Sequence, residues 1–153
     1  MRTPAGACLL LVPLLATGLP QALGAQATRP GAIIGWWHGT STCVKASWNA
    51  ACNDEVVLYE FVPSSPDSVR STVHAFKLVA GQRDSMGALP VAFVPEDQAW
   101  NADITTRRGA LRWTFRLHGD SLLGRLVLLP GMQVARHVVA LRGEGQASAG
   151  TAP

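Results

Sequence analysis

Short apolar runs separated by turn-forming residues recur along most of the chain, with the length and spacing that are typical of β-strands. The gaps between them are rich in Pro, Gly, Asn, Asp and Ser, which favour turns. No run shows the helical spacing of apolar residues over a length that would compete. The sequence therefore predicts an all-β domain with eight strands: Gly35–Val44, Glu55–Val62, Ser68–Val79, Ala88–Val94, Trp100–Arg107, Ala110–His118, Ser121–Leu129 and Met132–Arg142.

Apolar and polar residues alternate within these runs, so each strand has one face to bury. The run 110–118 shows this most clearly, because Leu111, Trp113, Phe115 and Leu117 alternate with polar residues. Short connections favour pairing of consecutive strands, and eight strands can close and leave no edge. We therefore expect an eight-stranded antiparallel up-and-down barrel. An open sandwich of seven or eight strands is the nearest alternative.

The last run alternates in a similar way. Its pattern predicts an inward face made of Ala135, His137, Val139 and Leu141, and it places Arg142 on the outward face.

The N-terminal residues have the pattern of a secretory signal peptide. Arg2 precedes the apolar segment Leu9–Leu19, which is too short to span a bilayer, and an Ala-x-Ala site follows at Ala25–Ala27. We expect a signal peptide over 1–27, a single barrel domain over 28–143 and a flexible tail over 144–153. No later apolar stretch reaches membrane-spanning length, so the mature chain is expected in the periplasm or outside the cell without a membrane span.

Two cysteines stay in the mature chain, because Cys8 leaves with the signal peptide. An even pair in an exported protein predicts a disulfide between Cys43 and Cys52. A redox or metal site is the alternative, but it would favour a C-x-x-C spacing or nearby histidines, and only His38 is close.

The charge of the chain gives no indication of a nucleic-acid partner. Thirteen basic and ten acidic residues leave a net charge of +3, and the basic residues form no cluster beyond Arg107 and Arg108.

Motifs of known catalytic sites are absent from the sequence, including a nucleophile elbow, a phosphate loop and H-E-x-x-H. The histidines lie on four different runs, at His38, His74, His118 and His137, and a barrel could bring His38 and His137 together. Metal or haem ligation by such residues stays open as an alternative. We expect no enzyme activity, no cofactor and no metal.

Aromatic residues on the inward faces give the strongest indication of a site. They would either fill a dry core or line an apolar pocket with one or two polar anchors. The candidate lining residues are Ser41, Tyr59, Phe93, Trp100, Trp113 and Phe115.

The segment Ile34-Gly35-Trp36-Trp37 resembles the G-x-W opening of the calycin superfamily, which includes the lipocalins. The resemblance implies a barrel in which Trp37 plugs the closed end, next to Gly35, and an arginine of the last strand, here Arg142, packs over it. The barrel, the inward aromatic residues, the signal-peptide pattern and the absence of catalytic motifs together lead us to expect an exported protein that binds a small, largely apolar molecule inside the barrel. The alternative is a packed barrel that acts through its surface, as an envelope or protein-interaction module. The sequence does not predict the oligomeric state.

Overall fold

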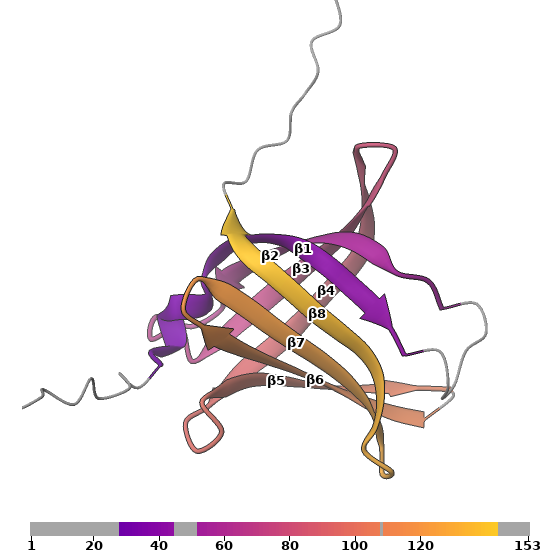
Figure 1. Cartoon of the computed structure of the whole chain (residues 1–153). Helices are drawn as coiled ribbons and strands as arrows, with labels where there is room; N and C mark the ends of the chain where they lie inside the picture. Colours follow the sequence, from indigo (N-terminus) through magenta and orange to yellow (C-terminus); the bar gives the residue numbers. More distant parts are fainter. Residues whose placement is uncertain (1–27, 45–51, 108, 144–153) are drawn as a thin grey trace, which may run out of the picture.

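Eight antiparallel strands close into a barrel in the computed structural model, which describes residues 28–44, 52–107 and 109–143 (Figure 1). Each strand pairs with the next one along the chain, and the last pairs with the first, so the predicted eight-stranded up-and-down barrel is confirmed. The elements are η1 (Pro30–Ile33), β1 (Gly35–Cys43), β2 (Glu55–Pro63), β3 (Arg70–Val79), β4 (Gln82–Val94), β5 (Ala99–Thr106), β6 (Gly109–His118), β7 (Ser121–Leu129) and β8 (Gln133–Gly143). The predicted signal peptide and tail lie outside the described residues.

Alternation along the strands produces the interior of the barrel. On β2, Val57, Tyr59 and Phe61 are buried, and on β6 Leu111 and Phe115 are buried, as the pattern predicts. No helix in the described part of the chain is long and apolar enough to cross a membrane.

The fourth strand is longer than the sequence predicts. It begins at Gln82 rather than Ala88, because the turn before it consists of only Ala80 and Gly81. Both residues have positive φ, 50° and 78°, as two-residue hairpin turns require. The polar start of β4 shows no apolar alternation because both of its faces are exposed, where the β3–β4 hairpin extends beyond the barrel (Figure 1).

The predicted inward face of the last strand is wrong beyond Ala135. The register with β7 shifts between Leu126, which pairs with Arg136, and Val127, which pairs with Val134, so Ala135 is an extra residue in a β-bulge. The bulge reverses the alternation. Ala135, Val138 and Ala140 are therefore buried, whereas Val139 and Leu141 are 53% and 59% exposed.

One end of the barrel is closed by the η1 turn and Trp37 on β1. The Trp37 indole is fully buried, and its Nε1 donates a hydrogen bond of 2.7 Å to the carbonyl oxygen of Ile33. The Arg142 guanidinium lies 4.3 Å from the centre of the Trp37 ring, and it donates to the carbonyl oxygens of Ile34 and Ala32. Gly35 has a φ of +116°, a conformation that favours glycine, and a Cβ there would meet Arg142 at 3.3 Å.

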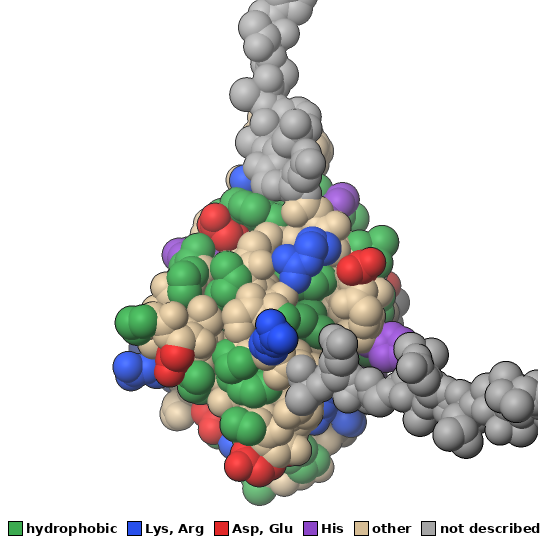
Figure 2. Space-filling model, turned by 90° about the vertical axis from the view of Figure 1, so that its left-hand side faces the viewer, with side chains coloured by type: hydrophobic (Ala, Val, Ile, Leu, Met, Phe, Trp, Pro, Cys, Tyr) green, Lys and Arg blue, Asp and Glu red, His purple; other side chains and the backbone are tan. Residues whose placement is uncertain are grey.

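The surface at this end mixes side chains of every kind (Figure 2). Hydrophobic groups are interspersed with charged and polar ones rather than gathered in one patch.

The end opposite the Trp37 plug, which we call the open end, carries a disulfide. Cys43, the last residue of β1, is bonded to Cys52, which precedes β2, with Cα atoms 5.9 Å apart. This confirms the predicted disulfide. Such bonds are typical of proteins that fold in an oxidising compartment outside the cytoplasm.

Candidate functional site

A cavity of about 330 Å³ lies inside the barrel, between β2, β3 and β4 on one side and β5 and β6 on the other. Its volume falls at the lower end of the range for small-molecule sites. The lining is predominantly apolar and consists of Tyr59, Val73, Ala75, Met86, Gly87, Ala88, Leu89, Ile104, Trp113 and Phe115.

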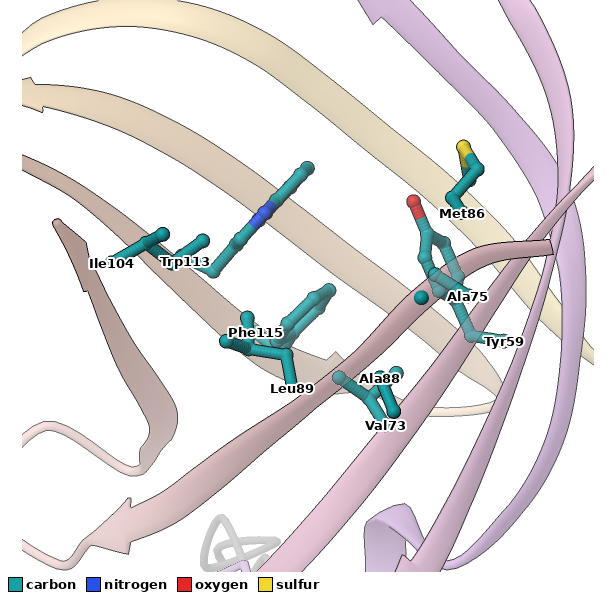
Figure 3. A pocket seen from close by; sticks show the side chains of 10 residues that line it. Tyr59, Val73, Ala75, Met86, Ala88, Leu89, Ile104, Trp113 and Phe115 are labelled. Carbon is teal, nitrogen blue, oxygen red and sulfur yellow. The ribbon is translucent and has the colours of Figure 1, made fainter. Parts of the chain in front are cut away.

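Stacked aromatic rings form one wall of this cavity, and a third ring faces it. Trp113 and Phe115 stack almost in parallel, with ring centres 5.3 Å apart and an angle of 9° between their planes. Tyr59 meets Phe115 edge to face at 5.9 Å. Figure 3 shows Trp113 and Ile104 on one side of the space, with Tyr59 and Met86 on the other. The wall offers a flat, polarisable surface to a ligand.

The Tyr59 hydroxyl is the main polar group of the lining. Burial raises the pKa of this phenol well above its ordinary value, although the charge of Arg136 and a hydrogen bond with Ser41 act in the opposite direction. The side chain is only 4% exposed. Tyr59 therefore stays neutral over the whole physiological pH range, and its hydroxyl can form a hydrogen bond with a ligand.

A polar cluster joins β8, β1 and β2 near the open end. Arg136 donates hydrogen bonds to Ser41 Oγ at 2.9 Å and to Glu55 Oε2 at 3.0 Å, and a third to the Asn53 carbonyl oxygen at 3.2 Å. Arg136 and Glu55 form a salt bridge whose side chains are 16% and 26% exposed. Because these charges compensate each other, they leave no net charge beside the cavity. The arrangement suits an uncharged or largely apolar molecule in the interior.

The candidate lining residues fall into two groups in the structure. Tyr59, Trp113 and Phe115 line the cavity. Ser41 belongs instead to the cluster around Arg136, and Phe93 and Trp100 pack against each other in the core with ring centres 4.9 Å apart.

Sequence reasoning missed the cavity residues contributed by β3, β4 and β5. Val73 and Ala75 lie on one inward face of β3, and their alternation was available in the sequence. Met86 gave no such indication, because the β3–β4 register shifts at this residue. Gly87 pairs with Ala75 and Ser85 pairs with Phe76, which leaves Met86 in a β-bulge.

The histidines do not converge. His38 pairs with Leu141, whereas His137 pairs with Thr42, four positions further along β1, so the two imidazoles attach about 13 Å apart along the strand. Among residues 28–44, 52–107 and 109–143, no three His, Cys, Asp or Glu side chains are grouped to hold a metal ion.

Comparison with the models of known protein families finds no match for this chain, and comparison with curated proteins finds none either.

Proposed function

We propose that this chain is an exported binding protein that takes a small, largely apolar ligand into a lipocalin-like barrel. The cavity carries the proposal, because an apolar space with an aromatic wall and a single buried hydroxyl is typical of small-molecule sites. The role is binding rather than catalysis, since the sequence contains none of the catalytic motifs considered above.

Three further observations support the export and family parts of this proposal. The N-terminal sequence has the pattern of a signal peptide, and the Cys43–Cys52 disulfide suits the periplasm or the extracellular space. Trp37 under Arg142 at the closed end also matches the arrangement that the calycin resemblance implies. A fold by itself does not give a function, so the ligand has to be tested directly.

The test is to titrate the mature protein with neutral apolar molecules, such as decanol and naphthalene, and to measure binding by the change in tryptophan fluorescence. We expect at least one of them to change the emission, and the change to shrink in a Trp113→Phe variant. Ala75→Phe fills the cavity and is expected to weaken binding by about tenfold or more, equivalent to about 1.4 kcal/mol.

Ala110→Phe is the matched control, because Ala110 lies on β6 but does not line the cavity. It should bind as the wild type does. If no molecule of a broad panel changes the emission, the proposed function is wrong.

The alternative function, an envelope or protein-interaction module, is favoured by a row of exposed residues on the outside of the barrel. Leu123, Val139, Thr40 and Val56 are successive partners across β7, β8, β1 and β2. The three hydrophobic members are 43%, 53% and 44% exposed. Sedimentation of the wild type and a Val139→Lys variant would test whether this row mediates association.

A further inference from the structure

The barrel is closed over only a short distance between β4 and β5, and we call this junction the β4–β5 seam. The two strands pair solely through Ala92–Asn101, Phe93–Trp100 and Val94–Ala99, next to the turn that joins them. Beyond these pairs, residues 84–91 of β4 and 102–105 of β5 form no ladder pairs across the seam in the described part of the chain, while their other sides face β3 and β6. The remaining neighbouring strands stay paired along most of their lengths.

The free edge of β4 is poorly suited to accept another strand. Pro90 has no backbone N–H, and the bulge at Met86 interrupts the ladder. Both features are typical of edges that are protected against strand addition. We therefore expect side chains, and not backbone pairing, to recognise what lies in this opening.

Spaces lie on both sides of the seam. Leu89 and Ile104 line the cavity inside the barrel. Their chain neighbours Pro90 and Asp103 line a second space of about 600 Å³ outside it, which we call the outer groove. The full lining of the outer groove is Ser64, Arg70, Ser71, Thr72, Pro90, Val91, Ala92, Asn101, Ala102 and Asp103.

Arg70 gives the outer groove a positive charge. The Asp103 carboxylate accepts two hydrogen bonds from Arg112, at 2.6 Å and 2.9 Å, so its charge is compensated. Arg70 forms no ion pair within the described ranges. The pKa of the nearby Asp67 is lowered chiefly by hydrogen bonds from Ser65 and the Val69 amide, and the Arg70 charge is the smallest contribution. In contrast to Arg70, two cations near the open end are held in ion pairs: Arg136 pairs with Glu55, and Lys77 pairs with Asp84. An anionic group in the groove would therefore meet, in Arg70, a cation that is not held in an ion pair within the described ranges.

Two buried polar atoms lie where the pairing of the seam ends. Trp100 Nε1 and Asn101 Oδ1 have no hydrogen-bond partner among the residues that the structure describes, and a buried polar atom that is kept from water without a partner is destabilising. Asn101 is the last β5 residue paired across the seam, so separation of β4 from β5 there would let water reach its Oδ1 and would lower the cost of opening the barrel at this point.

We propose that the ligand is an anionic amphiphile that crosses the β4–β5 seam, with its apolar part in the cavity and its anionic head in the outer groove against Arg70. This inference rests on the proposed function, because it requires the cavity to bind an apolar group. It adds the chemical class of the ligand and a binding site outside the barrel.

Three ligands with the same ten-carbon chain test the proposal: decanoate, decanol and decylammonium. Their affinities are measured by calorimetry for the wild type and for Arg70→Gln, Arg125→Gln and Ala75→Phe. Arg125 is the matched control, because it is an exposed arginine on β7 that lines neither space.

Decanoate should bind the wild type about two- to fivefold more tightly than decanol, as one exposed ion pair allows, and decylammonium should bind most weakly. Arg70→Gln should abolish the preference for decanoate without changing the affinity for decanol. Ala75→Phe should weaken both, and Arg125→Gln should alter neither. If the affinity for decanoate falls both in Ala75→Phe, inside the barrel, and in Arg70→Gln, outside it, the ligand spans the seam.

Other results separate the two proposals. If decanol and decanoate bind the wild type equally well, the cavity binds apolar chains and the outer groove plays no part, so this inference fails while the proposed function stands. Retention of the decanoate preference in Arg70→Gln would place the head elsewhere and would also overturn the inference. If none of the three ligands binds, both proposals fail.

Discussion

The closed end of the barrel and the β4–β5 seam differ in whether their buried polar groups are hydrogen-bonded. At the closed end the Trp37 indole N–H and the Arg142 guanidinium both donate to backbone carbonyl oxygens, and the ring and the cation also contact each other. At the seam, Trp100 Nε1 and Asn101 Oδ1 are buried and have no hydrogen-bond partner in the described part of the chain, and the two strands stop pairing after three residues.

This difference indicates where the fold is fixed and where it can yield. A buried polar group contributes to stability only when it is paired, and it weakens the region when it is not. We therefore expect the closed end to hold the strands together and the seam to be the part of the barrel wall that opens most easily. The cavity lies against the seam and not against the Trp37 plug.

Replacement of Trp37 should have the largest effect on stability. Trp37→Ala removes a fully buried ring, and we expect it to lower the free energy of unfolding by about 3–5 kcal/mol. Urea denaturation measures the change, with Trp37→Phe as a milder variant if the alanine variant does not fold. Trp36→Ala is the control, since this outward, half-buried neighbour should cost much less. Equal losses at the two positions would contradict the assignment of the closed end as the fixed region.

Removal of the disulfide should have the next largest effect. Cys43→Ala combined with Cys52→Ala opens a small loop at the open end, and we expect a loss of about 2–3 kcal/mol in the same assay. Affinity for decanol should stay unchanged, because neither cysteine lines the cavity. A large loss of affinity would mean that the open end shapes the site more than the seam does.

We expect the burial of Tyr59 to make the protein lose stability at high pH. The pKa of this buried phenol is raised in the folded state, so the unfolded chain loses its proton first as the pH rises above about 10. The stabilisation is complete below that pH, and it should then fall by up to about 1.4 kcal/mol per pH unit.

Tyr59 is the only tyrosine of the chain, so tyrosinate absorbance follows it directly. Native protein should form tyrosinate at a higher pH than urea-unfolded protein does. A Tyr59→Phe variant should lack this component of the alkaline loss of stability. Coincident titrations in the native and unfolded states would show that Tyr59 is not shielded from water.

Asn101 should give the smallest effect and the opposite sign. Asn101→Leu removes a buried acceptor that has no partner among residues 28–44, 52–107 and 109–143, so we expect a gain in unfolding free energy of up to about 1 kcal/mol. Asn101→Asp, which keeps the shape but adds a charge, should destabilise the protein. A clear loss in the leucine variant would show that the Asn101 side chain supports the seam.

The sequence by itself determined the strand count, the antiparallel order and most inward faces. Period-two alternation and turn residues are local properties of the chain, so Val57, Tyr59, Phe61 and Phe115 could be placed inside the barrel from their neighbours alone. The Cys43–Cys52 disulfide was equally accessible, because the mature chain contains only these two cysteines if the predicted signal peptide is removed.

Only the tertiary structure decided the register, and the register determines the site. The bulge at Ala135 reverses the alternation of β8 and turns Arg136 toward Ser41 and Arg142 toward Trp37. A bulge depends on an extra residue opposite a distant strand, which alternation within one strand does not reveal. Pairing between β4 and β5 stops after three residue pairs, which leaves the cavity and the outer groove beside it. This too depends on how all eight strands fit together when the barrel closes.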